Sequence, residues 1–428
     1  MPRDTVQVHG TVAASPEAVW AVVRNFCDGW HPAIATIRAE RDARGALIRA
    51  FTVTGEETLY REQLTWLSDS DRTLGYTHLQ GIARAESYNA RMSVTPAEGG
   101  GSTVFWTARV SADVVRLKQI CEGTAEVFRA GIAALGSVSA GHKAEAALPA
   151  AVSAEQMTID ELPRLALSVT PKTGGRTLCL FLHGIGGGRR NWAAQVGLAG
   201  TVMRAAALDL RGYGDSTLGH RPSTIDDYCA DILRVKEVLG ADRLVLVGLS
   251  YGSWIATSFA MRHPEMLAGL VLSGGCTGMS EAGPDEREAF RISREVPLNA
   301  GQTPADFAPA VVKVLAGPNA SDEARKALFD SMAAIPAATY RDALVCFTNP
   351  LERFDFSRLT MPVLMMTGEH DRLAPPDEIR GVAGRIWDTA PRPDVCFEVI
   401  GDAGHVCNLE QPAAYNRHLI NFLGKLPQ

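Results

Sequence analysis

The chain has 428 residues, of which 46% are hydrophobic and 21% are charged, and its formal net charge is −6. These values are typical of a soluble globular protein with two domains. The mild negative charge argues against nucleic acid and anionic membrane surfaces as partners, and no apolar run reaches the roughly 20 residues of a membrane span.

The first residues lack the apolar core of a signal peptide. The eight cysteines form no Cys-x-x-Cys pair, which argues against a metal site and a redox motif. We therefore expect a cytoplasmic protein with free thiols that works without a cofactor.

The N-terminal third begins with a strand-like alternation over residues 5–12. Ser15 and Pro16 then predict a helix start, with Ser at the cap and Pro at the first helical position. A long amphipathic helix is predicted over residues 113–135, because its apolar positions recur at helical spacing. Between the two helices, alternating segments occur at residues 37–41, 46–54, 57–67, 73–79, 87–95 and 103–112.

This order of strand, helix, antiparallel meander and long closing helix indicates an α+β helix-grip fold. The segment resembles the START-like, polyketide-cyclase-like (SRPBCC) superfamily at Ala14-Ser-Pro-Glu-Ala-Val-Trp20, Trp30-His31-Pro32 and Tyr60-Arg-Glu62. The resemblance implies an apolar small molecule in a cavity between sheet and helix. We expect residues 1–140 to form a domain that either binds such a ligand or mediates assembly of the protein into a homodimer.

No segment of this front domain has a motif with a defined mechanism. We interpret its polar and aromatic candidates as surface charges and core aromatics, and Trp30-His31-Pro32 as a structural corner. The candidates are His31, Arg61, Glu62, Tyr76 and Tyr88.

Residues 141–158 are rich in small residues and lack a sustained apolar period, so they are predicted to be a linker. In residues 159–428, strand-like segments alternate with helical ones, which predicts an α/β, doubly wound parallel sheet. About residues 276–360 lack strand-like alternation and hold helical segments, so we expect a helical lid there.

The most informative motif is Gly248-Leu-Ser-Tyr-Gly252, which ends an apolar strand and opens a helix. A serine on such a strand–turn–helix is a nucleophile elbow. The glycines are needed because the strained turn brings strand and helix too close for a Cβ. Ser250 is therefore the predicted nucleophile.

A second apolar strand, residues 178–182, runs into the glycine-rich turn His183-Gly-Ile-Gly-Gly-Gly188. Such a turn can aim backbone N–H groups into the site. We expect the N–H groups of Ile185 and Tyr251 to form the oxyanion hole.

Two later strands end in the remaining members of a triad. Asp371 follows the strand at 362–368, and His405 follows the strand at 395–400. The order Ser, Asp, His is that of hydrolases with this elbow. His405 is the predicted base and Asp371 its partner. Glu369 is a competing acid but lies nearer the strand.

From about Leu162 onward the chain resembles lid-bearing esterases and lactonases of the α/β-hydrolase fold. The resemblance rests on His183-Gly184, Asp209-Leu-Arg-Gly-Tyr-Gly-Asp-Ser216, the Ser250 elbow, Gly368-Glu-His-Asp371 and Gly404-His405. The stretch from His405 to Pro412 is similar to 3-oxoadipate enol-lactonases. Haloalkane dehalogenases and epoxide hydrolases use Asp at the elbow, so Ser250 argues against both.

The resemblance implies a serine hydrolase that cleaves a carboxylic ester or lactone of a small, largely apolar substrate through an acyl-enzyme. Two alternatives stay open: hydrolysis of a carbon–carbon bond in a vinylogous diketone, and a ligand receptor that keeps the triad. Arg211 and Asp215 are expected to brace loops. The candidates for the substrate pocket are Trp192, Phe290, Phe307 and Phe347.

Overall fold

The computed structural model describes residues 1–136, 147–351 and 353–427. They form two compact units: the described residues of 1–147 with 393–398, and the described residues of 148–392 with 399–428. Residues 141–146 of the predicted linker lie outside the described residues. Residues 155–158, also expected in the linker, belong to strand β8 (Glu155–Ile159).

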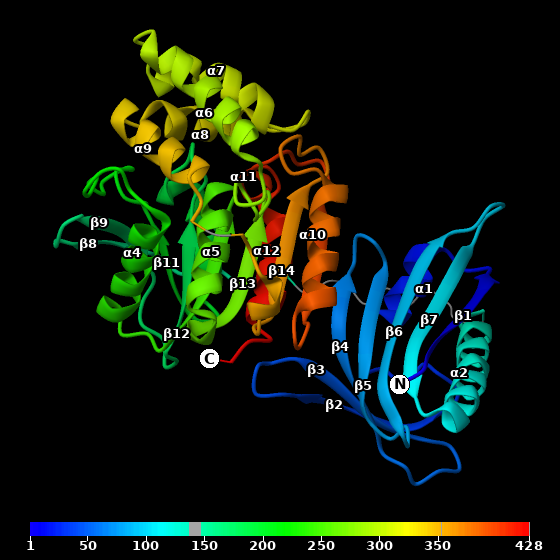
Figure 1. Ribbon diagram of the computed structural model, residues 1–428. Coiled ribbons are helices and arrows are strands. Elements are labelled where there is room, and N and C mark those ends of the chain that lie inside the picture. The colour runs from blue at the N-terminus through cyan, green and yellow to red at the C-terminus, as the bar shows by residue number, and fades with distance from the viewer. Residues whose placement is uncertain (137–146, 352, 428) are drawn as a thin grey trace. The chain divides into compact units, whose positions relative to one another are not determined.

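The first unit is an antiparallel sheet with a long closing helix, as the sequence predicts (Figure 1). In the described residues the strands pair in the order β2-β3-β4-β5-β6-β7-β1. The elements are β1 (Arg3–Val12), α1 (Pro16–Val23), β2 (Ile34–Arg41), β3 (Leu47–Val53), β4 (Tyr60–Ser68), β5 (Thr73–Gln80), β6 (Ala85–Pro96), β7 (Ser102–Ala112) and α2 (Val114–Leu135).

Helix α1 begins as predicted, because the Ser15 side chain accepts the N–H of Ala18 at 3.3 Å. Helix α2 buries its apolar stripe against the sheet, where Phe128 stacks on Trp106 with ring centroids 4.3 Å apart. His31 is buried and bonds the carbonyl of Val127 on α2 at 2.9 Å. This contact is consistent with the structural role that was expected for Trp30-His31-Pro32.

The interior of this unit holds an ion pair that the sequence did not reveal. Glu62 was interpreted as a surface charge, but it is buried and bonds Arg49 at 2.7 Å. The two residues are register partners on β3 and β4. The Arg49 guanidinium lies 4.4 Å from the Phe26 ring centroid. Burial is tolerated because each charge meets its opposite.

The second unit contains the parallel sheet. Strands β14, β13, β12, β10 and β11 pair in parallel in that order, and β9 and β8 add antiparallel strands beyond β11. The strands are β8, β9 (Leu165–Val169), β10 (Thr177–Leu182), β11 (Arg204–Leu208), β12 (Arg243–Leu249), β13 (Leu267–Ser273) and β14 (Val363–Gly368). Strand β15 (Val395–Ile400) is divided between the units: its residues up to Glu398 are assigned to the first unit and its last two residues to the second.

Helices connect these strands, as a doubly wound sheet requires. They are η1 (Arg189–Trp192), α3 (Ala193–Ala199), α4 (Ile225–Val238), α5 (Tyr251–Arg262), η2 (Pro264–Met266), η3 (Phe356–Arg358), α10 (Pro376–Thr389), α11 (Cys407–Glu410) and α12 (Pro412–Leu423). No helix in the described part of the chain has both the length and the apolar character to cross a membrane.

Four further helices form the predicted lid at the carboxyl ends of the parallel strands (Figure 1). They are α6 (Pro284–Asn299), α7 (Pro304–Leu315), α8 (Asp322–Ala333) and α9 (Ala337–Thr348). The described residues between β13 and β14 contain no strand. Because loops after parallel strands meet at one edge of the sheet, the lid covers the place where the motif residues gather.

Candidate active site

Ser250 lies in the turn between β12 and α5, with a φ of 54° that side-chain-bearing residues rarely adopt. A Cβ on Gly252 would overlap the carbonyl of Leu182, and one on Gly248 would collide with the start of α5. Both glycines are therefore required by close approach. The Ser250 N–H donates to the carbonyl of Ser273 at 2.7 Å, which ties the turn to β13.

His405 is held by Asp371, since its Nδ1 lies 2.9 Å from Oδ2 and 3.0 Å from Oδ1 of that carboxylate. Oδ1 also accepts the N–H groups of Leu373 and Ala374. Burial would raise the pKa of Asp371, but the hydrogen bond and charge of His405 and the two N–H donors outweigh it and lower that pKa. An ionised Asp371 keeps the proton on Nδ1 and leaves Nε2 as the basic nitrogen.

Glu369, the competing acid, takes a different partner. Its Oε2 accepts the N–H of Asp402 at 3.0 Å, and its side chain is largely exposed. Asp371 is therefore the carboxylate that bonds His405. The side chains of Glu369, His370 and Asp402 approach one another within 4.8 Å and form the group in the described residues that could hold a metal ion.

The turn after β10 lies against the elbow, because a Cβ on Gly184 would be 3.5 Å from the Cβ of Ser250. Nε2 of His183 accepts the N–H of Leu210 at 3.0 Å, so Nδ1 carries the hydrogen and donates to the Gly184 carbonyl at 2.8 Å. Burial lowers the pKa of His183, which keeps the ring neutral. In a trans peptide the C=O of Gly184 and the N–H of Ile185 point in opposite directions. Fixing the carbonyl therefore fixes the direction of the Ile185 N–H.

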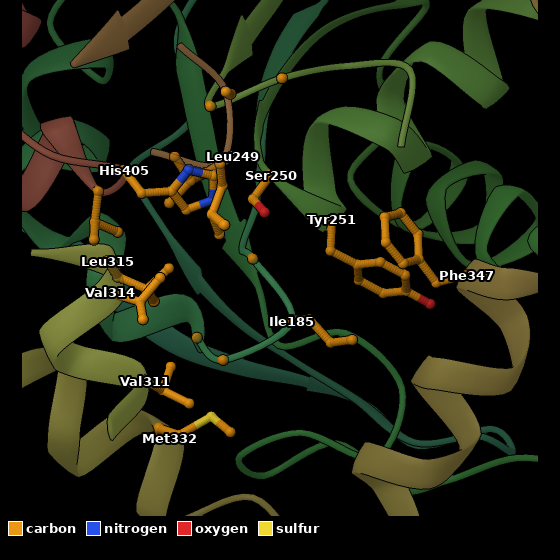
Figure 2. Close-up of a pocket in the computed structure, with 18 of the residues that line it drawn as sticks. Ile185, Leu249, Ser250, Tyr251, Val311, Val314, Leu315, Met332, Phe347 and His405 are labelled. Atoms are coloured by element: carbon orange, nitrogen blue, oxygen red, sulfur yellow. The ribbon is translucent and has the colours of Figure 1, made fainter. Parts of the chain in front are cut away.

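A cavity of about 570 Å³ lies between this edge of the sheet and the lid. Ser250, His405, Ile185 and Tyr251 all line it (Figure 2). The predicted pocket residues that line it are Phe290, Phe307 and Phe347, and Met332 and several valines and leucines of the lid add to the apolar wall.

Trp192 was expected in this pocket, and that prediction is wrong. Its side chain is fully buried, packs against the Phe181 ring with centroids 5.1 Å apart, and does not line the cavity. Helix η1 turns Trp192 toward the sheet and leaves Asn191 to face the cavity, where its side chain accepts the N–H of Gly188 at 2.8 Å.

Comparison with known proteins decides the family. Residues 178–412, more than half of the chain, match the family described as alpha/beta hydrolase fold. The chain belongs to this family. Residues 3–140 match a second family, described as polyketide cyclase / dehydrase and lipid transport.

Individual proteins resemble this α/β hydrolase over about three fifths of its length. A 2-hydroxy-6-oxononadienedioate/2-hydroxy-6-oxononatrienedioate hydrolase of Paraburkholderia phymatum is 29% identical, over 59% of this chain and 88% of the relative. A thermophilic esterase from Thermogutta terrifontis has a TM-score of 0.53 at 26% identity, over 64% of this chain and 98% of the esterase. An enol-lactonase from Burkholderia xenovorans LB400 shares the fold, with a TM-score of 0.51 at 20% identity over 61% and 96%.

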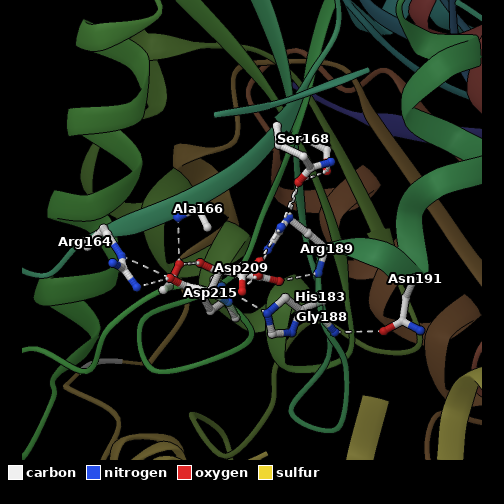
Figure 3. A network of polar contacts seen from close by, with 12 residues as sticks. Arg164, Ala166, Ser168, His183, Gly188, Arg189, Asn191, Asp209 and Asp215 are labelled. Carbon is white, nitrogen blue, oxygen red and sulfur yellow. Dashed lines mark hydrogen bonds and ion pairs between the residues drawn. The ribbon is translucent and has the colours of Figure 1, made fainter. Parts of the chain in front are cut away.

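An ionic network with Arg189 and Asp209 buried at its centre lies beside the glycine-rich turn of this hydrolase (Figure 3). Asp209, at the end of β11, accepts the N–H of Arg189 at 2.7 Å and pairs with its guanidinium. Arg189 also bonds Asp215 at 2.6 Å and Gln156 of β8 at 2.7 Å. Arg211 pairs with Asp231 at 2.8 Å. Arg211 and Asp215 thus contact other loops and helices of the scaffold, as expected.

Glu410 was not predicted as a site residue, although it lies in the stretch from His405 to Pro412. Its Oε2 accepts the N–H of Gly404 at 3.0 Å and the N–H of Gly317, just after α7, at 2.8 Å. The His405 N–H donates to the carbonyl of Leu315 at 2.8 Å. One carboxylate therefore ties the His405 loop to the lid. In the sequence Glu410 lies five residues after the histidine, within the stretch that carries the resemblance to enol-lactonases.

We expect Glu410→Ala to lower the free energy of unfolding by about 2–4 kcal/mol, because two buried N–H groups lose their acceptor. Turnover should fall as well, since the His405 loop loses its attachment to the lid. Glu410→Gln keeps an oxygen acceptor and should lose less. Urea unfolding and kcat of both variants test this, and an Ala variant with wild-type stability would contradict it.

Proposed function

We propose that this protein hydrolyses a carboxylic ester or lactone of a small substrate through an acyl-enzyme on Ser250. The observation that supports this best is the His405–Asp371 pair, whose imidazole lines the same cavity as the strained Ser250. A nucleophile, a base and an acid that orients the base are the parts that acyl transfer needs.

In the proposed reaction, Ser250 Oγ attacks the carbonyl carbon while Nε2 of His405 takes the hydroxyl proton. The N–H groups of Ile185 and Tyr251 stabilise the negative charge on the carbonyl oxygen. His405 then protonates the leaving alcohol, and the ester bond breaks. Water repeats the sequence on the acyl-enzyme and releases the acid, which restores the Ser250 hydroxyl.

Hydrolysis of a carbon–carbon bond next to a ketone is the second candidate. It is favoured by the similarity to the Paraburkholderia hydrolase, whose name specifies an oxo-dienedioate substrate. The same serine and histidine would act in this reaction. The leaving group would be a carbon atom, and His405 would protonate that carbon where it protonates an alcohol oxygen in ester hydrolysis. The two candidates differ in the substrate and not in the residues.

We expect p-nitrophenyl butyrate to give a burst of p-nitrophenol close to one equivalent of enzyme, provided that deacylation is the slower step. Mass spectrometry of the quenched protein should then find a butyryl group on the peptide that contains Ser250. Stopped-flow absorbance measures the burst.

The other outcomes separate the alternatives. Turnover of a vinylogous 1,5-diketone acid, with no hydrolysis of aryl esters or lactones, would favour carbon–carbon cleavage. Binding of esters without turnover of either class would favour the receptor and would contradict the hydrolase.

A further inference from the structure

Arg294 introduces a positive charge into a largely apolar wall of the cavity. It lies on lid helix α6 and is the one arginine or lysine among the described residues that line the cavity. Its neighbours in the wall include Phe290, Phe307 and Phe347. An apolar acyl or ring pocket would not need a cation here.

The guanidinium is placed by its own helix. It lies 3.4 Å from the centroid of the Phe290 ring, and Nη1 donates to the Phe290 carbonyl at 3.2 Å and to Ser293 Oγ at 3.0 Å. In the described part of the chain, Nε and Nη2 have no hydrogen-bond acceptor. The arginine is oriented, but three of its five N–H donors are left for another molecule.

No carboxylate of the described residues lies at ion-pair distance from Arg294. Arg291, one turn earlier on α6, pairs with Glu288 and Glu295. The acid among the cavity residues, Glu378, is exposed and forms no ion pair with Arg294. The charge on Arg294 therefore has no counter-ion within the described protein.

Partial burial of this guanidinium is unfavourable without an anion. Burial lowers the pKa of Arg294, although an arginine stays protonated at neutral pH. A half-buried cation with unused donors gains most from a ligand that brings the opposite charge into the cavity. A carboxylate matches the planar fork of the guanidinium, because two parallel N–H···O bonds can form.

We propose that Arg294 is a carboxylate-binding residue and that the substrate carries a free carboxylate in addition to the carbonyl attacked by Ser250. This inference rests on the proposed function. It changes the expected substrate class from a largely apolar ester to a monoester or lactone of an acid. Arg294 would orient the substrate, while the apolar wall holds its carbon chain.

Two matched pairs of aryl esters test this proposal. One pair is the mono-p-nitrophenyl ester of glutaric acid and its terminal carboxamide. The other is 4-butyryloxybenzoate and 4-butyryloxybenzamide, which place the charge on the leaving group. In at least one pair we expect Arg294→Met to lower kcat/KM for the anionic ester by about 10- to 100-fold, with little change for the amide. Arg294→Lys should recover part of the loss.

Arg291→Met is the matched control, because this arginine lies on the same helix, is paired, and does not line the cavity. It should leave the ratio of kcat/KM between anionic and neutral esters unchanged. If Arg294→Met leaves that ratio unchanged in both pairs, the proposed carboxylate-binding role of Arg294 is wrong, while the proposed hydrolase activity is unaffected.

If the wild type hydrolyses none of the four esters, the proposed function fails and binding decides the inference. Calorimetry then compares glutarate and 4-butyryloxybenzoate binding to Ser250→Ala and to Ser250→Ala/Arg294→Met. A tenfold or greater loss of affinity for either anion in the double variant supports the carboxylate site. Equal affinities, or no binding of either anion, overturn it.

Discussion

Ser250→Ala should lower kcat for p-nitrophenyl butyrate by about 10⁴- to 10⁶-fold, because the residues of such a triad act as a unit. The backbone should not change, since alanine and serine accept the φ of 54° at this position about equally. The acylated peptide should disappear as well. Steady-state kinetics, with circular dichroism as a check of folding, measure these effects.

Ser258→Ala is the matched control for this variant. Ser258 is a buried serine on the same helix, α5, and does not line the cavity. Its kcat should stay within about twofold of wild type, as for a substitution away from the chemistry. Retention of more than a tenth of the wild-type kcat by Ser250→Ala would show that another group attacks the substrate.

Asp371→Asn should lower kcat by about 10⁴-fold with little change in fold. The asparagine oxygen can still accept the N–H groups of Leu373 and Ala374. Its NH2 group, however, would donate to Nδ1 of His405 and place the ring hydrogen on Nε2. The base would then be in the wrong tautomer and would lack the negative charge that stabilises its protonated form. Steady-state kcat measures the loss.

Glu369→Gln tests whether the neighbouring acid matters, because Glu369 is two residues from Asp371 but bonds the N–H of Asp402. Its kcat should stay within about threefold of wild type. The opposite pattern, a large loss of kcat in Glu369→Gln and a small one in Asp371→Asn, would show that Glu369 is the acid of the triad and that the assignment to Asp371 is wrong.

Local sequence signals predicted the elements of this protein well. Ser15 and Pro16 marked a helix start, and the alternation of residues 103–112 marked β7. The lid followed from helical periods between two strand-like segments. Such signals work because capping, side-chain alternation and helical spacing depend on residues only a few positions apart.

The order of strands and loops in the sequence was enough to place Ser250, Asp371 and His405 at one edge of the sheet. Each of these residues follows a predicted strand, and parallel strands end at a common edge. Which acid faces His405 is a question of side-chain direction, and there Asp371 bonds the imidazole while Glu369 bonds Asp402.

Contacts between distant segments were decided only by the tertiary structure. The burial of Glu62 depends on Arg49 in the next strand, and the inward turn of Trp192 depends on the ring of Phe181. Glu410 bonds an N–H just after α7, 93 residues away in the chain. Arg294 stands out only in the tertiary structure, which shows that it lines the cavity and that no carboxylate of the described residues lies at ion-pair distance from it. Periodicity is a property of neighbours in the chain, whereas a counter-ion, a buried face or an unused donor is a property of neighbours in space.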